Sequence, residues 1–357
     1  MNASANLRKS YIRTSVLIPI PPTGPDAGDS TLKRRTLRAQ APEVDDAQRQ
    51  RIVQTLDYLE YQTRCAMDRE GSMPSPIKEY SLGNSTVEVQ GSRGSQAKRM
   101  LTIYPFKDMN WVVTMFFVVG SIVFVINGAL GLLPVINPAL AFPTLTTVAL
   151  PATILMGAAM FMTGGILAVF AAFNANRGTL ELTGGKSIEG DTNFVYRPAL
   201  IGSPAWVWIP KAADVAALLR TLPFQAGLMQ LSGGSILSVA AVAGIPGLID
   251  PNDLALTQTL VFMPQVIGGS MFFVANFALM IFAQDVWYKP KFGSGEWLGA
   301  TWNAFASSGF AITGGLLLLG DFSGASVVSF VASSAFLIGT IIQWYVLMEF
   351  HATPWAS

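Results

Sequence analysis

The sequence predicts an all-α membrane protein, a six-helix transmembrane bundle built from three hairpin repeats behind a largely disordered, partly helical cytoplasmic N-terminal region. Three observations lead to this fold. Of the 357 residues, 51% are hydrophobic and only 13% are charged, whereas soluble proteins carry about 25% charged residues. The mean hydropathy is +0.44. The charges also cluster, because 16 of the 23 Lys and Arg residues fall within residues 1–109.

Composition excludes several classes of function. A net charge of +1 argues against a nucleic-acid-binding protein, which needs a basic surface. The single cysteine, Cys65, rules out a disulfide framework, and the single histidine, His351, rules out a His pair for zinc. The sequence has no phosphate-binding loop and no hydrolase elbow. We therefore expect no enzyme, and no catalytic, cofactor-binding or metal site.

Residues 1–103 form the predicted cytoplasmic N-terminal region. Residues 1–42 are rich in Pro, Gly, Ser and basic side chains, a composition typical of disorder. In residues 43–70 the apolar side chains recur at helical intervals, and the charged side chains fall on the opposite helix face. This pattern predicts an amphipathic helix. Residues 86–104 begin with alternating apolar and polar positions, a pattern that favours a small β-hairpin.

Residues 104–351 form the predicted membrane domain. A membrane-spanning helix needs about 20 apolar residues, and six segments reach that length without any Asp, Glu, Lys or Arg. We expect them to pair as three helical hairpins, over about 104–177, 204–285 and 287–350. The six predicted spans are 111–133, 146–173, 227–249, 256–283, 298–319 and 325–347.

The loops between the spans predict the orientation. After residue 109, every Lys and Arg falls in two of the five links, 174–226 and 284–297. The other three links carry no basic residue. Because basic residues mark the cytoplasmic side, we expect a multi-pass protein with both termini in the cytoplasm. The sequence is compatible with the plasma membrane or an endomembrane.

Similar short motifs precede each predicted hairpin. An aromatic residue, a proline and a lysine recur there, and aromatic rings and lysines favour the membrane–water interface. Glycines inside the spans allow helix backbones to approach closely. Together these recurrences predict a threefold repeat. The predicted interfacial anchors are Tyr104, Pro105, Lys107, Trp208, Pro210, Lys211, Tyr288, Pro290 and Lys291, and the predicted helix-packing residues are Gly120, Gly157, Gly234, Gly268 and Gly269.

Two cytoplasmic links have a character of their own. Residues 178–195 contain a Gly-Gly pair between two polar and β-branched runs, which predicts a short hairpin or an ordered loop. Residues 204–222 mix tryptophans and leucines with a few charges. This composition favours a helix in the headgroup plane or an extension of the third span.

Neutral polar residues are the strongest candidates for a site within the spans. Ionisable residues usually mark proton and ion pathways in membranes, and the predicted spans contain none. The neutral polar residues that lie deepest either bond helix to helix or line a path for a neutral solute. The candidate path residues are Asn127, Gln265, Asn276 and Asn303.

Two stretches, Tyr104–Pro134 and Arg197–Pro210, resemble integral membrane proteins of fungi that have no assigned activity. The Gly-Ser-Ile hairpins around Gly120 and Gly234 are also similar to the two-span YrhK-like membrane module. The resemblance covers the membrane domain alone. It implies a fungal source, and no activity or site residues.

Three functions follow from these observations. The first is a non-enzymatic membrane organiser that contacts lipid and binds a cytoplasmic protein partner through residues 1–103. The alternative is a channel or facilitator for a small neutral solute. The third is an interfacial lipid-modifying enzyme that uses Asp285, Glu296 or the link at 178–222. An oligomer is compatible with all three, and none of them involves nucleic acid.

Overall fold

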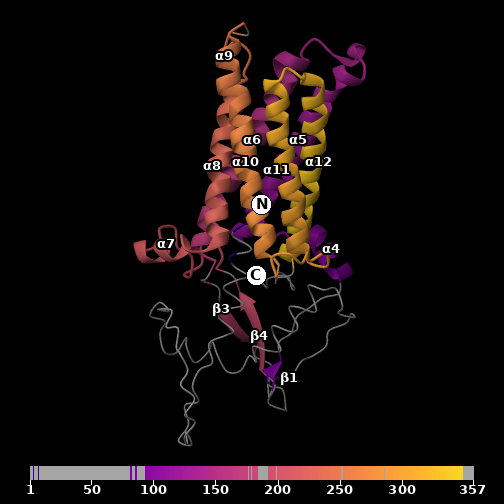
Figure 1. Ribbon diagram of the computed structural model, residues 1–357. Helices are drawn as coiled ribbons and strands as arrows, with labels where there is room; N and C mark the ends of the chain where they lie inside the picture. The colour runs from indigo at the N-terminus through magenta and orange to yellow at the C-terminus, as the bar shows by residue number, and fades with distance from the viewer. Residues whose placement is uncertain are drawn as a thin grey trace, which may run out of the picture.

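The computed structural model describes residues 3, 7, 81–82, 85–86, 93–175, 177, 179–183, 192–197, 199–250, 252–284 and 286–348. The helix predicted over 43–70 and most of the region predicted as disordered lie outside these residues. A bundle of long helices dominates the fold (Figure 1). The long helices are α5 (Met109–Ile136), α6 (Leu150–Phe173), α8 (Leu222–Ala243), α10 (Met263–Phe282), α11 (Gly295–Leu318) and α12 (Phe322–Leu347).

Five of these helices are long and apolar enough to cross a membrane: α5, α6, α8, α10 and α12. With the turns that precede them, α6 and α10 lengthen to 29 residues each, Leu145–Phe173 and Leu254–Phe282. The chain is therefore a helical, multi-pass membrane protein. Helix α11 has 24 residues and lies in the same bundle, but its sequence is less apolar than that of the other five.

The six long helices form a closed ring. Each helix packs against the next in the order α5, α6, α8, α10, α11 and α12, and α12 packs back against α5. The chain thus runs around the ring as three successive antiparallel pairs. Within each pair a short connection makes the two helices neighbours, whereas the link from α6 to α8 is long and contains β3, β4 and α7.

The outer face of the ring is apolar on every helix. Large hydrophobic side chains that are 40–55% exposed project from each of the six. Such a continuous apolar surface fits lipid and would be a liability in water. Representative members are Ile126 on α5, Ile166 on α6, Val239 on α8, Val274 on α10, Phe305 on α11 and Val331 on α12.

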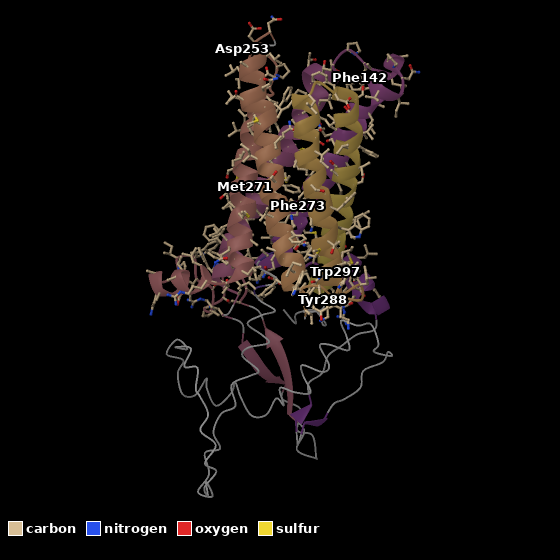
Figure 2. All side chains as sticks on the ribbon, in the orientation of Figure 1. Phe142, Asp253, Met271, Phe273, Tyr288 and Trp297 are labelled. Carbon is tan, nitrogen blue, oxygen red and sulfur yellow. The ribbon has the colours of Figure 1, made fainter. Side chains whose placement is uncertain are left out.

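The two ends of the bundle differ in character. Phe142 and Asp253 lie at one end, and Tyr288 and Trp297 lie at the other (Figure 2). We call the first the turn end, since among the described residues it holds the short connections 137–149, 244–250, 252–253 and 319–321. We call the second the basic end, because it holds the two links that carry the lysines and arginines. Gly320 makes the turn between α11 and α12 at φ +81°, a backbone conformation that glycine adopts without strain.

The helix starts are explained by caps and prolines. The side chain of Asp108 accepts a hydrogen bond from the Asn110 amide at 3.0 Å and caps α5. Helices α6 and α10 start differently, each after a π-helical turn, η2 (Leu145–Ala149) and η3 (Gln258–Phe262). In both cases a proline, Pro151 or Pro264, follows at the first helical positions.

The second helices of the three pairs do not all start alike. Helix α12 lacks the π-helical turn found before α6 and α10, and it is capped by Asp321 instead. The threefold repeat therefore stays a prediction.

A four-stranded sheet lies at the basic end, in the order β1-β2-β4-β3. Strands β3 (Thr179–Thr183) and β4 (Thr192–Arg197) pair antiparallel, which confirms the hairpin predicted over 178–195. Strands β1 (Ser81–Leu82) and β2 (Ser85–Thr86) form a second, shorter pair. The fold is therefore helical with this one small sheet.

Two short helices flank the basic end (Figure 1). Helix α7 (Ala212–Leu218) lies across the bundle axis within the predicted 204–222 segment. The hairpin predicted over 86–104 is wrong, because residues 93–102 form helix α4. The alternation covers only the start of this stretch, and residues 96–101 are Gln, Ala, Lys, Arg, Met and Leu, all of which favour helix. Buried Arg99 on α4 also donates a hydrogen bond to the Met348 carbonyl after α12.

The predicted packing glycines lie on the inner and crossing faces of the ring. Gly120 on α5 faces the Phe161 ring of α6, and Gly157 on α6 faces the Phe124 ring of α5. Gly268 faces α8, and Gly269 faces the backbone of Ala311 on α11. Gly234 has more room, because a Cβ there would lie 3.6 Å from Phe272.

Two adjacent glycines on α11 offer a direct test of helix packing. A Cβ at Gly314 would lie 2.8 Å from the Val266 amide nitrogen on α10, whereas a Cβ at Gly315 would meet no atom within 4 Å. We expect Gly314→Ala to lower the free energy of unfolding by about 1–3 kcal/mol through overpacking. Gly315→Ala should be neutral or stabilising, since alanine favours helix. Thermal unfolding of both variants in detergent tests this difference in stability. Equal unfolding midpoints would contradict the prediction that only position 314 is overpacked.

Candidate functional site: a central cavity and the layers beneath it

A cavity of about 420 Å³ lies inside the ring, toward the turn end. All six long helices contribute to its wall, and both π-helical turns border it through Thr146 and Val261. Most of the lining is apolar. Among the residues that the structure describes, no ionisable side chain lines this cavity. Its polar lining residues are Asn127, Thr146, Gln265, Thr313, Ser326, Ser329 and Ser333.

Phenylalanines close the cavity on the side of the basic end. On five helices the deepest lining residue is a phenylalanine, and on α8 it is Gly234. Four of the rings form a closed circuit with centroid separations of 5.1–6.2 Å, within the range of favourable aromatic pairs. We call this set the phenylalanine layer: Phe124, Phe161, Phe272, Phe310 and Phe336.

A polar layer lies about one helical turn beyond the phenylalanines. The Gln230 side chain on α8 donates a hydrogen bond to Asn276 Oδ1 on α10 at 2.9 Å. The Asn276 amide nitrogen donates to Ser307 Oγ on α11 at 3.1 Å and to the Phe272 carbonyl at 2.9 Å. These bonds tie α8, α10 and α11 together. The polar layer is Gln230, Asn276, Asn303 and Ser307.

Asn303 is the exception within this layer. Its side chain is fully buried, and neither of its amide atoms has a hydrogen-bond partner in the part of the chain that the structure describes. Asn303 lies against Gly339 of α12, where a Cβ would come 2.5 Å from Asn303 Oδ1. A buried amide without a partner costs about 1–3 kcal/mol. Asn303 therefore has hydrogen-bonding capacity that no described group uses.

The four candidate path residues fall into two groups. Asn127 and Gln265 line the cavity, and Asn127 also donates hydrogen bonds to Thr153 Oγ1 and the Leu150 carbonyl on α6. Asn276 and Asn303 lie beyond the phenylalanine layer and do not line the cavity. The structure thus places Asn127 and Gln265 on the cavity and Asn276 and Asn303 in the buried polar layer.

Sequence reasoning missed the phenylalanine layer. Four of its five rings share a helix face with polar residues of the site at helical spacing: Phe124 precedes Asn127 by three residues, for example, and Phe272 precedes Asn276 by four. Phe161 on α6 has no such neighbour. Helical periodicity anchored on the polar residues could have found the other four rings. Aromatic residues in membrane helices are common, however, and their type alone gave no reason to single them out.

The predicted interfacial anchors lie at the basic end, outside the cavity. Tyr104, Trp208 and Tyr288 are 52–69% exposed, as expected for rings that contact headgroups. Lys107, Lys211 and Pro290 are exposed, Pro210 and Lys291 are half-buried, and Pro105 is buried. Asp285 lies outside the described residues, and Glu296 is half-buried in the first turn of α11.

No family model, curated protein or solved structure matches the chain. The resemblance to fungal membrane proteins and to the YrhK-like module is therefore not supported. The site must be interpreted from its own chemistry.

The polar layer gives a paired test. Asn276→Leu removes the acceptor of Gln230, which leaves a buried amide unpaired and should lower the free energy of unfolding by about 1–3 kcal/mol. Asn303→Leu removes an amide that has no partner, so we expect an unchanged or higher midpoint. Thermal unfolding in detergent measures both. Similar losses in the two variants would show that hydrogen bonding does not distinguish these residues.

Proposed function

We propose that the protein is a non-enzymatic membrane facilitator that binds a small, uncharged and mainly apolar molecule inside the ring and passes it between the two ends. The observation that carries this proposal is the central cavity, which is walled by all six helices of the closed ring. Of the three functions considered from the sequence, the facilitator is the one this geometry favours.

The size and chemistry of the cavity support a particular class of ligand. Its volume of about 420 Å³ falls within the roughly 300–1,000 Å³ typical of small-molecule sites. A charged ligand would lose its hydration without gaining a counter-charge there, which is costly. The seven neutral polar lining residues can instead bond a hydroxyl, amide or carbonyl group. A medium-chain alcohol has the required combination of apolar chain and single polar group.

The arrangement of the helices supports six spans. Helix α11 packs along both α10 and α12, two helices that are apolar enough to cross a membrane. We therefore propose that α11 crosses with them and is less apolar because it faces the lumen with Asn303, Ser307 and Thr313.

The orientation of the bundle follows from the distribution of basic residues. Since basic residues mark the cytoplasmic side, we propose that the basic end faces the cytoplasm.

The organiser predicted from the sequence depends on a protein partner for residues 1–103. Only a few of these residues are described, so this function, like the oligomer, stays a prediction.

A ligand test uses 1-decanol as the probe and decanoate as its charged counterpart, with the full-length protein in lipid nanodiscs. Ligand that binds only the folded state stabilises it, by about 2.7 kcal/mol at a hundredfold excess over Kd. We expect 1-decanol to raise the midpoint of thermal unfolding by several degrees and decanoate to leave it unchanged. Equal shifts with both would point to an effect on the lipid instead.

A matched pair of variants locates the binding. Ala241 on α8 lines the cavity, and Val239 two residues earlier is 48% exposed on the outer face. Ala241→Phe should fill part of the cavity and abolish the shift caused by 1-decanol, whereas Val239→Phe should preserve it. Retention of the shift in Ala241→Phe would place the probe elsewhere and contradict the proposal.

The sixth span can be tested with cysteine labelling in a Cys65→Ser background. Tyr288 precedes α11 and Phe322 follows it, and both side chains are well exposed. If α11 crosses the membrane, an impermeant maleimide should label Phe322→Cys on intact cells and Tyr288→Cys only after permeabilisation. Labelling of both from the same side would show that α11 does not cross.

A further inference from the structure

The polar and apolar residues of the central cavity lie on different walls. Among the described residues, α6 and α8 contribute only apolar ones to the lining, for example Ile154, Ala158 and Leu237. Six of the seven polar lining residues come from α5, α10, α11 and α12, and the seventh, Thr146, lies in the turn before α6. A molecule with one polar group and one apolar chain therefore has a preferred orientation there, because each wall suits one part of it.

Three side chains on the polar wall have unused hydrogen-bonding groups. Serines in membrane helices often donate to the carbonyl one turn earlier, as Ser326 and Ser334 of α12 do. Ser329 and Ser333 of the same helix make no hydrogen bond to any described residue, and neither does the Gln265 amide on α10. Ser333 is only 2% exposed, so water outside the bundle does not satisfy its hydroxyl. We call Gln265, Ser329 and Ser333 the head-group subsite.

The head-group subsite lies deep in the cavity. Ser333 precedes Phe336 of the phenylalanine layer by three residues and Ser329 precedes it by seven, so both serines lie on one stripe of α12. On α10, Gln265 precedes Phe272 of the same layer by seven residues. Ser329 and Gln265 are therefore about two helical turns from the layer, and Ser333 is about one turn from it. A polar group bound there would lie close to the phenylalanines.

The cavity has its mouth between α6 and α8. Of its described lining residues, only Thr146 and Gly244 are exposed. Thr146 lies in η2 just before α6, and Gly244 caps the end of α8. No short link joins these two helices at the turn end, and they pack less extensively than any other neighbours in the ring. Figure 2 agrees, since Phe142 before α6 and Asp253 beyond α8 lie at opposite sides of that end.

The surroundings of the mouth are apolar. Val148 and Val242, each two residues from a mouth residue, are 56% and 48% exposed. No Asp, Glu, Lys or Arg occurs in 142–150 or in 240–248. Exposed apolar side chains without accompanying charges favour contact with the bilayer over contact with water.

We propose that the cavity is loaded sideways from the bilayer by a single-chain, uncharged amphiphile. Its hydroxyl bonds to the head-group subsite, and its chain lies along α6 and α8 and leaves through the mouth into the lipid. This inference rests on the proposed function, and it adds the residues that select the ligand and the route by which the ligand enters. A chain that extends into lipid need not fit inside the cavity, so the ligand class includes alcohols longer than 1-decanol.

Two adjacent serines test the head-group subsite. Ser333→Ala removes an unused hydroxyl of the cavity, whereas Ser334→Ala removes one that is bonded to the Phe330 carbonyl and lies outside the lining. The full-length protein in nanodiscs is titrated with 1-decanol or 1-hexadecanol, each as a mole fraction of the lipid, and the half-maximal rise in unfolding midpoint is measured. We expect Ser333→Ala to need roughly three- to tenfold more of either alcohol, the loss typical of one hydrogen bond.

The Ser334→Ala variant should respond like the unchanged chain. Equal responses of the two serine variants would overturn the subsite. A response to 1-decanol without any response to 1-hexadecanol would show that the chain must fit inside the cavity, and it would overturn the exit through the mouth.

Thiol accessibility tests the mouth without any ligand. In a Cys65→Ser background, Ser329→Cys places a thiol in the cavity, and Val331→Cys places one on the outer face of the same helix. We expect dodecyl methanethiosulfonate, which dissolves in the bilayer, to modify these two thiols at comparable rates. A cationic methanethiosulfonate in water should modify Ser329→Cys roughly a hundredfold more slowly than the exposed Lys211→Cys, because a charge loses its hydration in an apolar passage.

A bulky side chain at the mouth gives a matched pair. Thr146→Trp should block the mouth and slow the dodecyl reagent at Ser329→Cys severalfold. Thr147→Trp changes the next residue, which is also exposed but lies outside the lining, and should leave the rate unchanged. Ala306→Cys, fully buried on α11, should stay unreactive in every variant, which separates an open mouth from a loosened fold.

Two results would overturn the mouth. One is a dodecyl reagent that fails to reach Ser329→Cys. The other is a cationic reagent that reaches it as fast as Lys211→Cys, which would mean an opening to water. If the mouth is open but no alcohol stabilises the protein, the route stands, while the facilitator and its alcohol ligand are wrong. If 1-decanol stabilises the unchanged chain and both serine variants alike, the facilitator stands and the subsite is wrong.

Discussion

In a bilayer, helices gain no hydrophobic energy by associating, so close contact and a few hydrogen bonds must hold them together. The closed ring depends on this constraint. At the seam where the last helix meets the first, a Cβ on Gly128 of α5 would lie 2.8 Å from the Phe330 Cα of α12. A larger residue there would force α5 and α12 apart. Without that seam the helices would enclose no lumen, and both the cavity and the phenylalanine layer would be lost.

The ring has two chemically different halves. The polar layer joins α8, α10 and α11 through amide and hydroxyl hydrogen bonds. On the other half, α5, α6 and α12 meet largely through aromatic rings, among them Phe117, Phe124, Phe161 and Phe336. Hydrogen bonds between buried groups are directional and fix the register of their helices. Aromatic contacts tolerate sliding more readily, so movement that separates the rings need not break the amide bonds.

The helices were predictable from sequence because each apolar run is ended by Pro, Gly, Asn or a charge. Short links make neighbours of α5 and α6, of α8 and α10, and of α11 and α12, but the closure of these pairs into a ring was not predicted. The positions of Asn127 and Gln265 on the cavity, by contrast, depend on how neighbouring helices rotate, which composition does not report. Residues 93–102 show one limit, since the alternation at the start of 86–104 favoured a hairpin and does not continue into the stretch that forms the helix. The burial of Ala3 and Leu7 had no local signal, because it depends on the small residues that pack around them.

The absence of ionisable side chains from the described lining of the cavity has an electrical consequence. A membrane potential does work of about 2.3 kcal/mol per elementary charge for each 100 mV. Under the proposed function the ring passes an uncharged molecule, so the crossing moves no charge and the voltage would neither drive nor oppose it. The concentrations of the molecule on the two sides alone would then set the direction of the proposed transport.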